Sequence, residues 1–279
     1  MLIKIFGNKY LLGRNGLLPI IPDFRKGNDI KGLNKLAGHT SLVIGGNSGI
    51  GFSVVKTFLR EGATVIASAR HIGELKTIES SKFEYLKWDI ADVDSSKKNI
   101  DYLFDKYGFI DDIIICAGVN TCPNNNATDY VEKKWQETEF IHSVNLIGVC
   151  EICKYILIKS KGLQVNRQPK IVNVISNGAY MATPEPYFTS KHALLSFTKA
   201  FMKESEGNLR VYGICPGEVR TKMIVHGLFT LFSRSTKDYR KGHPDEIAEL
   251  ALLLCSSAGD DMKSNICVFD GGERILEQY

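Results

Sequence analysis

The stretch Ser41-Leu-Val-Ile-Gly-Gly-Asn-Ser-Gly-Ile-Gly-Phe52 places four glycines within seven residues, directly after an apolar run. The residues that follow it, Ser-Val-Val-Lys-Thr-Phe-Leu, have the spacing of an amphipathic helix. The pattern predicts a strand, a glycine-rich turn and a helix. In an open α/β sheet such a turn lies beyond the carboxyl end of a strand, where ligands bind.

Glycines lack a Cβ, so their backbone can approach a pyrophosphate closely, and the free N–H groups at the start of a helix attract anions. A glycine-rich turn by itself also occurs where nothing binds. Here it follows a predicted strand and opens a predicted helix, which favours a dinucleotide site. The expected contacts from this turn are Gly45, Asn47, Ser48, Gly49, Ile50 and Gly51.

Composition narrows the possible classes of protein. A length of 279 residues with 44% apolar residues suffices for one large α/β domain or two small ones. The net charge of +4 is spread along the chain without a dense basic block, so we expect no nucleic-acid partner. The seven cysteines lack metal-type pairing, which indicates a reducing compartment and no metal site.

Cys150-Glu-Ile-Cys153 has the spacing of a redox motif, but it lies within a helical pattern. Packing in the core is therefore the preferred interpretation of these two cysteines.

The N-terminal region differs from the rest. No apolar stretch approaches the roughly eighteen residues that span a bilayer, so we expect no integral membrane segment. Residues 1–22 carry Lys4, Lys9 and Arg14 with no acid, a weak likeness to an organelle presequence, although Ser is absent and Gly and Pro interrupt any helix. We expect a cytoplasmic protein, with a presequence as the alternative. Residues 1–36 are interpreted as a non-catalytic arm, packing on the core or on a neighbouring subunit, and residues 37–279 as one domain.

Beyond residue 37, short apolar runs alternate with longer amphipathic segments, which is typical of βαβ units around a parallel sheet. The predicted strands are residues 41–45, 63–68, 83–88, 112–116, 170–175, 209–214 and 266–269. Helices are expected over residues 94–107, with Asp94 as N-cap and Gly108 just past the end, and over 245–256; Gly62 closes the first helix. The fold class is therefore α/β, a doubly wound seven-stranded parallel sheet with helices on both faces.

The end of the second strand bears on the choice of cofactor. An acid there would hold the ribose hydroxyls of NAD, but the strand ends in Ala69 followed by Arg70. The absence of an acid and the presence of Arg70 favour NADP(H) as the cofactor, and NAD(H) is the alternative. The alternative is that Arg70 is a solvated surface residue.

Tyr187-Phe-Thr-Ser-Lys191 opens another predicted helix. Residues four apart share a helix face, so the phenol and the ammonium can face one cleft. We expect the nearby cation to lower the tyrosine pKa towards neutrality, which would suit proton exchange with a carbonyl or an alcohol. Such a pair is also common on surfaces.

Further short motifs accompany this pair in a fixed order. They are Gly45-x3-Gly49-Ile50-Gly51, Asp89-Ile90, Ala117-Gly118, Asn145, Ser176, Tyr187-x3-Lys191, Pro216-Gly217 with Thr221, and Asp270-Gly271-Gly272. Taken together, the ordered set resembles the short-chain dehydrogenase/reductase family, in its compact single-domain branch. The resemblance covers about residues 35–274 and implies a Rossmann fold.

The resemblance also implies roles. Tyr187 would be the proton donor, Lys191 would hold the nicotinamide ribose, Ser176 would hydrogen-bond the substrate oxygen, and Asn145 would hold a water linked to Lys191. Cofactor contacts would add Asp89 and Ile90 at the adenine, Ala117 and Gly118 along the ribose, and Pro216, Gly217, Val219 and Thr221 at the nicotinamide. From the residues alone, Asn145 could instead serve a helix bend, Ser176 a strand end and Asp89 a turn.

The chain departs from the family pattern in four places. Ile44 stands where a hydroxyl residue is usual, and Ile115-Cys116 replaces an Asn-Asn pair that ties the sheet together. The interval from Ser176 to Tyr187 is shorter than is typical, and Tyr180 and Met181 within it are either pocket walls or packing residues. Residues 222–243, a mobile lid in the family, are apolar in one half and basic in the other, so they could cover a substrate or simply be solvated.

The preferred hypothesis is an NADPH-dependent carbonyl reductase acting on a small-molecule carbonyl or alcohol, as a homotetramer or homodimer. One alternative is a catalytically weak NADP-binding sensor or scaffold, which would not need Tyr187 beside Lys191. Another is a sugar-nucleotide epimerase or dehydratase, but the chain lacks the additional C-terminal domain of that branch.

Overall fold

The computed structural model describes residues 2–5, 8–13, 16–19, 32–120, 135–163, 167–221, 241–262 and 265–271. The chain forms two compact units, Met1–Gly32 and Leu33–Tyr279. The first unit holds an antiparallel sheet of β1 (Leu2–Ile5), β2 (Asn8–Gly13) and β3 (Gly16–Pro19). These three strands were not expected from the sequence. The glycines that exclude a long helix here are also residues that tight hairpins favour.

The second unit is built on a seven-stranded sheet in which every neighbouring pair is parallel, in the order β10-β9-β8-β7-β4-β5-β6. The strands are β4 (Thr40–Ile44), β5 (Thr64–Ala69), β6 (Phe83–Lys87), β7 (Asp112–Ile115), β8 (Lys170–Val174), β9 (Arg210–Pro216) and β10 (Ile266–Phe269). All the predicted strands are present with small shifts at their ends. The predicted doubly wound sheet is therefore confirmed.

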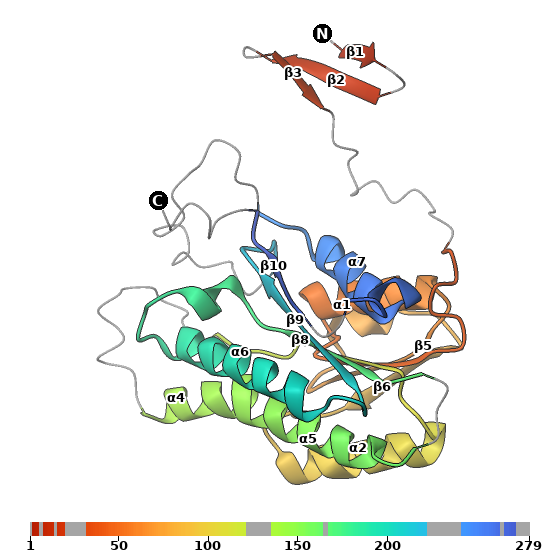
Figure 1. The fold of residues 1–279 in the computed structure, drawn as a ribbon, viewed down its shortest axis with the longest axis vertical. Coiled ribbons are helices and arrows are strands. Elements are labelled where there is room, and N and C mark those ends of the chain that lie inside the picture. The colour runs from red at the N-terminus through yellow and green to blue at the C-terminus, as the bar shows by residue number, and fades with distance from the viewer. Residues whose placement is uncertain are drawn as a thin grey trace. The chain divides into compact units, whose positions relative to one another are not determined.

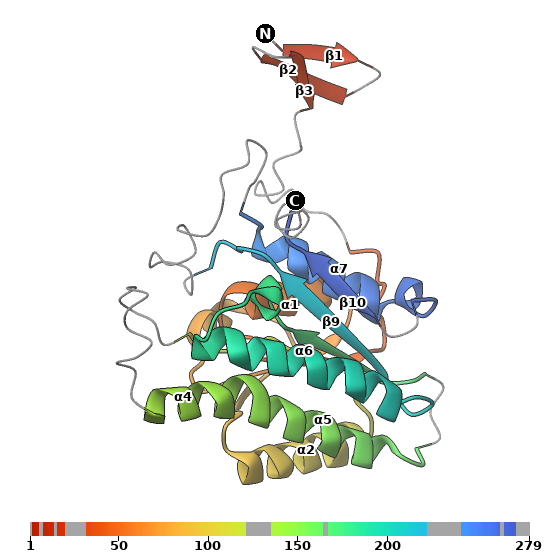
Figure 2. The same cartoon turned by 60° about the vertical axis from the view of Figure 1, so that its left-hand side comes forward.

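Helices cover both faces of this sheet (Figures 1 and 2). On one face lie α1 (Gly49–Arg60) and α7 (Pro244–Cys255); on the other lie α2 (Val93–Tyr107), α5 (Gly148–Ser160) and α6 (Pro186–Glu204). Strand β4 shows how the sequence builds two core layers, because Leu42 and Ile44 join one hydrophobic cluster and Val43 joins the other. Apolar residues on both sides of each strand thus bind helices to both faces.

The order of strands determines where a ligand can enter. The chain winds outward from β4 through β5 and β6, and then crosses back to β7 on the other side of β4. The loops after β4 and β7 consequently diverge at the carboxyl edge of the sheet, which opens a crevice at this switch point. The glycine-rich turn, which directly follows β4, lies at that crevice.

One long helical run passes along the sheet through α4 (Trp135–His142), a π-helical turn η2 (Ser143–Ile147) and α5. Among the described residues, its segment Glu137–Ser160 is apolar and long enough, by length and composition alone, to cross a membrane. An apolar segment of this length was not expected from the sequence. Half of its most apolar window is buried within the fold, and residues such as Ile152 and Ile156 lie in the core. Packing against the sheet accounts for the apolar length of this core helix.

The helix ends show one error in the sequence analysis. Gly62 (φ 90°) and Gly108 (φ 71°) follow the ends of α1 and α2 in left-handed conformations, as expected. The predicted N-cap Asp94 is wrong, because it lies inside the first turn of α2. The cap is Asp92, whose side chain accepts a hydrogen bond from the Ser95 N–H at 2.9 Å. Only Asp92 combines extended backbone with a carboxylate placed at the free N–H groups.

This assignment predicts different costs for two neighbouring substitutions. Asp92→Ala should lower the free energy of unfolding by about 1 kcal/mol, because it leaves N–H groups of the first turn without a partner. Asp94→Ala should cost less in moderate salt, which screens the interaction of a charge with the helix dipole. Urea denaturation followed by circular dichroism measures both. An equal or larger loss for Asp94→Ala would contradict the assigned cap.

Candidate active site

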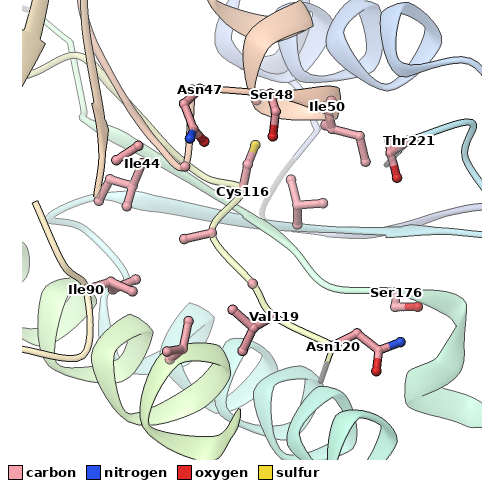
Figure 3. Close-up of a pocket in the computed structure, with 18 of the residues that line it drawn as sticks. Ile44, Asn47, Ser48, Ile50, Ile90, Cys116, Val119, Asn120, Ser176 and Thr221 are labelled. Carbon is pink, nitrogen blue, oxygen red and sulfur yellow. The ribbon is translucent and has the colours of Figure 1, made fainter. Parts of the chain in front are cut away.

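A cavity of about 280 Å³ lies at the carboxyl edge of the sheet. It is bounded by the glycine-rich turn, the ends of β5, β7 and β9, the turn after β6, and the start of α6 (Figure 3). The predicted cofactor contacts all line it: Gly45, Asn47, Ser48, Gly49, Ile50, Gly51, Arg70, Asp89, Ile90, Ala117, Gly118, Tyr187, Lys191, Pro216, Gly217, Val219 and Thr221. Residues from distant parts of the sequence therefore meet at one place.

The glycine-rich turn lies against the end of β7, with no room for a side chain at Gly45 or Gly51. A Cβ on Gly45 would come within 2.5 Å of the Ala117 nitrogen, and one on Gly51 within 2.2 Å of the Gly45 oxygen. The N–H groups of Gly45 and Gly46 donate to the Ser68 carbonyl at 2.7 and 3.1 Å. The turn is thus held flat between the ends of β5 and β7, where it forms a floor of bare backbone.

The start of α1 faces the cavity with donors available. Its N-cap Ser48 has extended backbone and makes no side-chain capping bond, and the first turn contains no acid. The first N–H groups of a helix have no partner within the helix, and they carry partial positive charge. Nearby, the buried Ser68 Oγ has no hydrogen-bond partner among the described residues. A bare backbone floor and free donors fit a dinucleotide with its pyrophosphate over the start of α1.

The far end of the cavity carries charged and aromatic groups. Arg70 is exposed just past the end of β5. Asp89 lines the cavity and also accepts a hydrogen bond from the Ala91 N–H at 3.1 Å, so the turn role considered for it is present. Trp88, which the sequence analysis missed, is 3% exposed and lines the same wall. Trp88 directly precedes Asp89, and this position in the sequence could have identified it as a residue of the cavity wall.

The side chains expected to be catalytic come from α6 and from the end of β8. Tyr187 and Lys191 lie one turn apart on α6, and the Lys191 Nζ is 5.8 Å from the centroid of the Tyr187 ring. Lys191 is buried, and its Nζ donates to the Val174 carbonyl at 3.3 Å. Ser176 lines the cavity beside them, and its Oγ accepts a hydrogen bond from the Gly178 N–H at 3.0 Å. One turn of α6 and the end of β8 therefore bring a phenol, an ammonium and a hydroxyl to one cavity.

Burial determines the acidity of this pair. It lowers the pKa of Lys191 to about 8, because the charged ammonium is desolvated. Burial also raises the pKa of Tyr187, and a hydrogen bond with Ser176 opposes that shift. The expectation that Lys191 lowers the tyrosine pKa is therefore wrong. Desolvation of the phenolate outweighs the hydrogen bond with Ser176.

Asn145 lies behind the cavity wall, in the π-helical turn. Its side chain is fully buried; Oδ1 accepts from the Val119 N–H at 2.8 Å, and Nδ2 donates to the Val119 carbonyl at 3.0 Å and to Ser190 Oγ at 3.1 Å. A Cβ on Gly118 would lie 3.5 Å from Asn145 Oδ1 and 3.6 Å from Lys191 Nζ. Asn145 thus ties a helix bend to the loop after β7 and also lies near Lys191.

The cysteines have different surroundings. Cys116 lines the cavity, and Figure 3 shows its thiol pointing toward the turn that carries Asn47 and Ser48. Burial raises the pKa of Cys116 to about 12. Burial also raises the pKa of Cys150 and of Cys153, which supports packing over a redox role for the CxxC pair.

The remaining predictions concern the loop before α6 and the lid segment. Tyr180 and Met181 are not among the described residues that line the cavity, and Tyr180 packs against the hydrophobic core. Of the proposed lid, residues 222–240 lie outside the described residues.

Glu218, which was not predicted from the sequence as a site residue, is buried in the cavity wall. A lone acid between Gly217 and Val219 carries no signal of burial in the sequence.

Comparison with known proteins agrees with this geometry. Residues 39–226 match the model of the short chain dehydrogenase family. An A-factor type gamma-butyrolactone 1'-reductase (1S-forming) of Streptomyces virginiae is 29% identical over 259 residues, which cover 86% of this chain and 97% of that protein. A 3-oxoacyl-(acyl-carrier-protein) reductase of Thermotoga maritima is 28% identical over 252 residues, covering 85% and 98%.

Solved structures show the same fold. The ligand-free aldohexose dehydrogenase of Thermoplasma acidophilum matches with a TM-score of 0.72 at 25% identity, covering 88% of this chain and 97% of that one. A short-chain dehydrogenase/reductase of Brucella melitensis, described as a glucose/ribitol dehydrogenase, matches with a TM-score of 0.74 at 25% identity, covering 85% and 97%. The family match spans well over half of the chain. The chain therefore belongs to the short chain dehydrogenase family and is an oxidoreductase of CH–OH or C=O groups with a nicotinamide cofactor.

Proposed function

We propose that the protein is an NADP(H)-dependent carbonyl reductase, reversible as an alcohol dehydrogenase, with Tyr187 as its general acid and base. The supporting observation is that Tyr187, Lys191 and Ser176 line one cavity with the glycine-rich turn. The nicotinamide, when bound, supplies or accepts the hydride. The protein then has to hold the substrate oxygen and move one proton.

Each side chain has a defined part in this proposal. Tyr187 Oη donates a proton to the carbonyl oxygen, and Ser176 Oγ hydrogen-bonds that same oxygen. Lys191 holds the cofactor ribose, and Asn145 holds the loop after β7 in place beside it. Because burial raises the pKa of Tyr187, the phenol keeps its proton near neutral pH, which favours the reductive direction.

The alternative functions have less support. A sensor or scaffold would need the cofactor cavity but no phenol and ammonium within it. The epimerases and dehydratases of the longer branch need an additional substrate domain. Two full-length reductases instead match this chain over 97% and 98% of their own length.

The preference for NADP(H) is supported by the end of β5. Ala69 ends the strand without an acid, and the exposed guanidinium of Arg70 lines the cavity next to it. A guanidinium binds a phosphate in a bidentate manner, whereas an acid would repel one. NAD(H) is the alternative cofactor.

We also propose a cytoplasmic homotetramer or homodimer that acts on a small-molecule carbonyl or alcohol. The assembly would form through α6 and α7, and the support for it is Leu253, an apolar residue of α7 that is 42% exposed. Closed symmetric assemblies commonly bury such faces.

Tyr187→Phe tests the proton donor. We expect turnover to fall by about 10² to 10⁴-fold, the usual contribution of a general acid, while the Kd for NADPH changes little. Tyr180→Phe is a matched control, because Tyr180 does not line the cavity. Steady-state kinetics and fluorescence titration give the two readouts. Near-normal turnover in the Tyr187 variant would exclude the proposed role.

Lys191 predicts a pH dependence of cofactor binding. Its pKa of about 8 means that the ammonium is charged below this pH and loses its proton as the pH rises through it. The Kd for NADPH should therefore increase above about pH 8 in the wild type. Lys191→Arg, which stays charged, should give a flatter profile. If the arginine variant shows the same increase, another group is responsible.

Arg70→Asp tests cofactor selection. The change removes a phosphate partner and adds repulsion, so the ratio of kcat/KM for NADPH to that for NADH should fall by about tenfold or more. Arg70→Gln separates the two effects and should give a smaller fall. An unchanged ratio in both variants would show that Arg70 does not select the cofactor.

A further inference from the structure

Ser190 is a fully buried residue of α6, three positions after Tyr187 and directly before Lys191. Its Oγ donates a hydrogen bond to the Tyr187 carbonyl at 2.6 Å and accepts one from Asn145 Nδ2 at 3.1 Å. The single hydroxyl proton is thus bound to a main-chain carbonyl and not to the phenol. In the part of the chain that the structure describes, Ser190 does not line the cavity, so any effect on the reaction has to pass through its neighbours.

The bond to Asn145 continues to the loop after β7. Asn145 Oδ1 accepts from the Val119 N–H at 2.8 Å, and Nδ2 also donates to the Val119 carbonyl at 3.0 Å. One amide therefore binds both polar groups of the Val119 main chain, and the same amide is bound to Ser190. The result is a continuous path of hydrogen bonds from the Tyr187 main chain to the main chain of Val119.

This path joins two walls of the cavity, because Tyr187 and Val119 both line it. The walls approach each other closely: a Cβ on Gly118 would lie 3.5 Å from Asn145 Oδ1 and 3.6 Å from Lys191 Nζ. A proton donor must lie within hydrogen-bond distance of the oxygen that it protonates. A small displacement of α6 from the loop is therefore enough to slow the proposed proton transfer.

A second site on α6 has the same pattern of hydrogen bonds away from the cavity. Thr198 is fully buried; its Oγ1 donates to the Leu194 carbonyl at 2.7 Å and accepts from the Nδ2 of Asn173, on β8, at 3.1 Å. Neither Thr198 nor Asn173 belongs to the described lining of the cavity. This site is a control in which a hydroxyl and an asparagine serve packing alone.

We propose that Ser190 is a positioning residue for the reaction, which holds the helix that carries Tyr187 and Lys191 at a fixed distance from the loop after β7. It acts through Asn145 and exchanges no proton with the substrate. This inference rests on the proposed carbonyl reductase, in which Tyr187 donates the proton.

The test compares loss of the hydroxyl at the two sites, as Ser190→Ala and Thr198→Val. The substrates are a β-keto ester, ethyl acetoacetate, and a hydroxyketone, dihydroxyacetone, and the readouts are kcat, the Kd for NADPH and the thermal unfolding midpoint. Ser190→Ala should lower kcat by about tenfold or more, with a much smaller change in Kd, because misplaced groups slow the chemical step. Thr198→Val should leave kcat close to that of the wild type.

The unfolding midpoints separate positioning from stability. Thr198→Val removes the acceptor of a buried Asn173 donor, whereas in Ser190→Ala the Asn145 amide keeps its bonds to Val119. A buried donor without a partner is costly, so Thr198→Val should lower the midpoint at least as much as Ser190→Ala does. The variant with the larger loss of kcat is then not the one with the larger loss of stability.

Two further variants test the path through Asn145. If Ser190 acts through Asn145, the double variant Ser190→Ala with Asn145→Ala should have the same kcat as Asn145→Ala alone. Ser190→Thr keeps a hydroxyl that can bond the carbonyl of the preceding turn, so it should retain more of kcat than Ser190→Ala. The threonine variant decides the question if Asn145→Ala does not fold.

Three results would overturn the inference: an unchanged kcat in Ser190→Ala, an equal loss of kcat in Thr198→Val, or a double variant whose loss is the product of the two single losses. Each of these leaves the proposed function standing, because the wild type still reduces a ketone. If the wild type reduces neither ketone, nor any member of a broad carbonyl panel, with NADPH or NADH, the proposed function itself fails, and this inference with it.

Discussion

The structure depends on a contact that no side chain could enter, the approach of the glycine-rich turn to the end of β7. A Cβ at Gly45 or Gly51 would overlap backbone atoms, so the turn lies flat only because these residues are glycine. The flat turn directs the start of α1 at the crevice between β4 and β7. The same contact therefore produces both the floor of the cavity and the donors for an anion.

A second constraint, burial, gives the cavity its chemistry. Desolvation lowers the pKa of Lys191 and raises that of Tyr187, so in each case it favours the neutral form. A protonated phenol next to Ser176 suits proton delivery to a carbonyl oxygen. The π-helical turn contributes indirectly, because Asn145 uses its amide to fix Val119 in the loop that forms the opposite wall.

The sheet and the placement of the predicted contacts could be read from local patterns. Short apolar runs between amphipathic segments indicated the strands, and Gly62 and Gly108 indicated helix ends. Such patterns can be recognised because each depends on only a few neighbouring residues. The errors concern properties that depend on three dimensions. Asp92 and Asp94 lie in the same short stretch, and only the backbone decides which one caps α2. The acidity of Tyr187 depends on burial, which a Tyr-x3-Lys spacing does not reveal. Glu218 and Trp88 are assigned to the cavity only once β6 and β9 are placed.

We propose that the glycine floor holds a reduced nicotinamide dinucleotide. Trp88 lines the cavity, so its fluorescence is a direct reporter of an occupied site. We would titrate the full chain with NADPH and with NADH, and follow tryptophan quenching. We expect saturable quenching by both cofactors, with the lower Kd for NADPH. If neither cofactor gives saturable quenching or energy transfer from tryptophan to the nicotinamide, the glycine floor does not hold this dinucleotide.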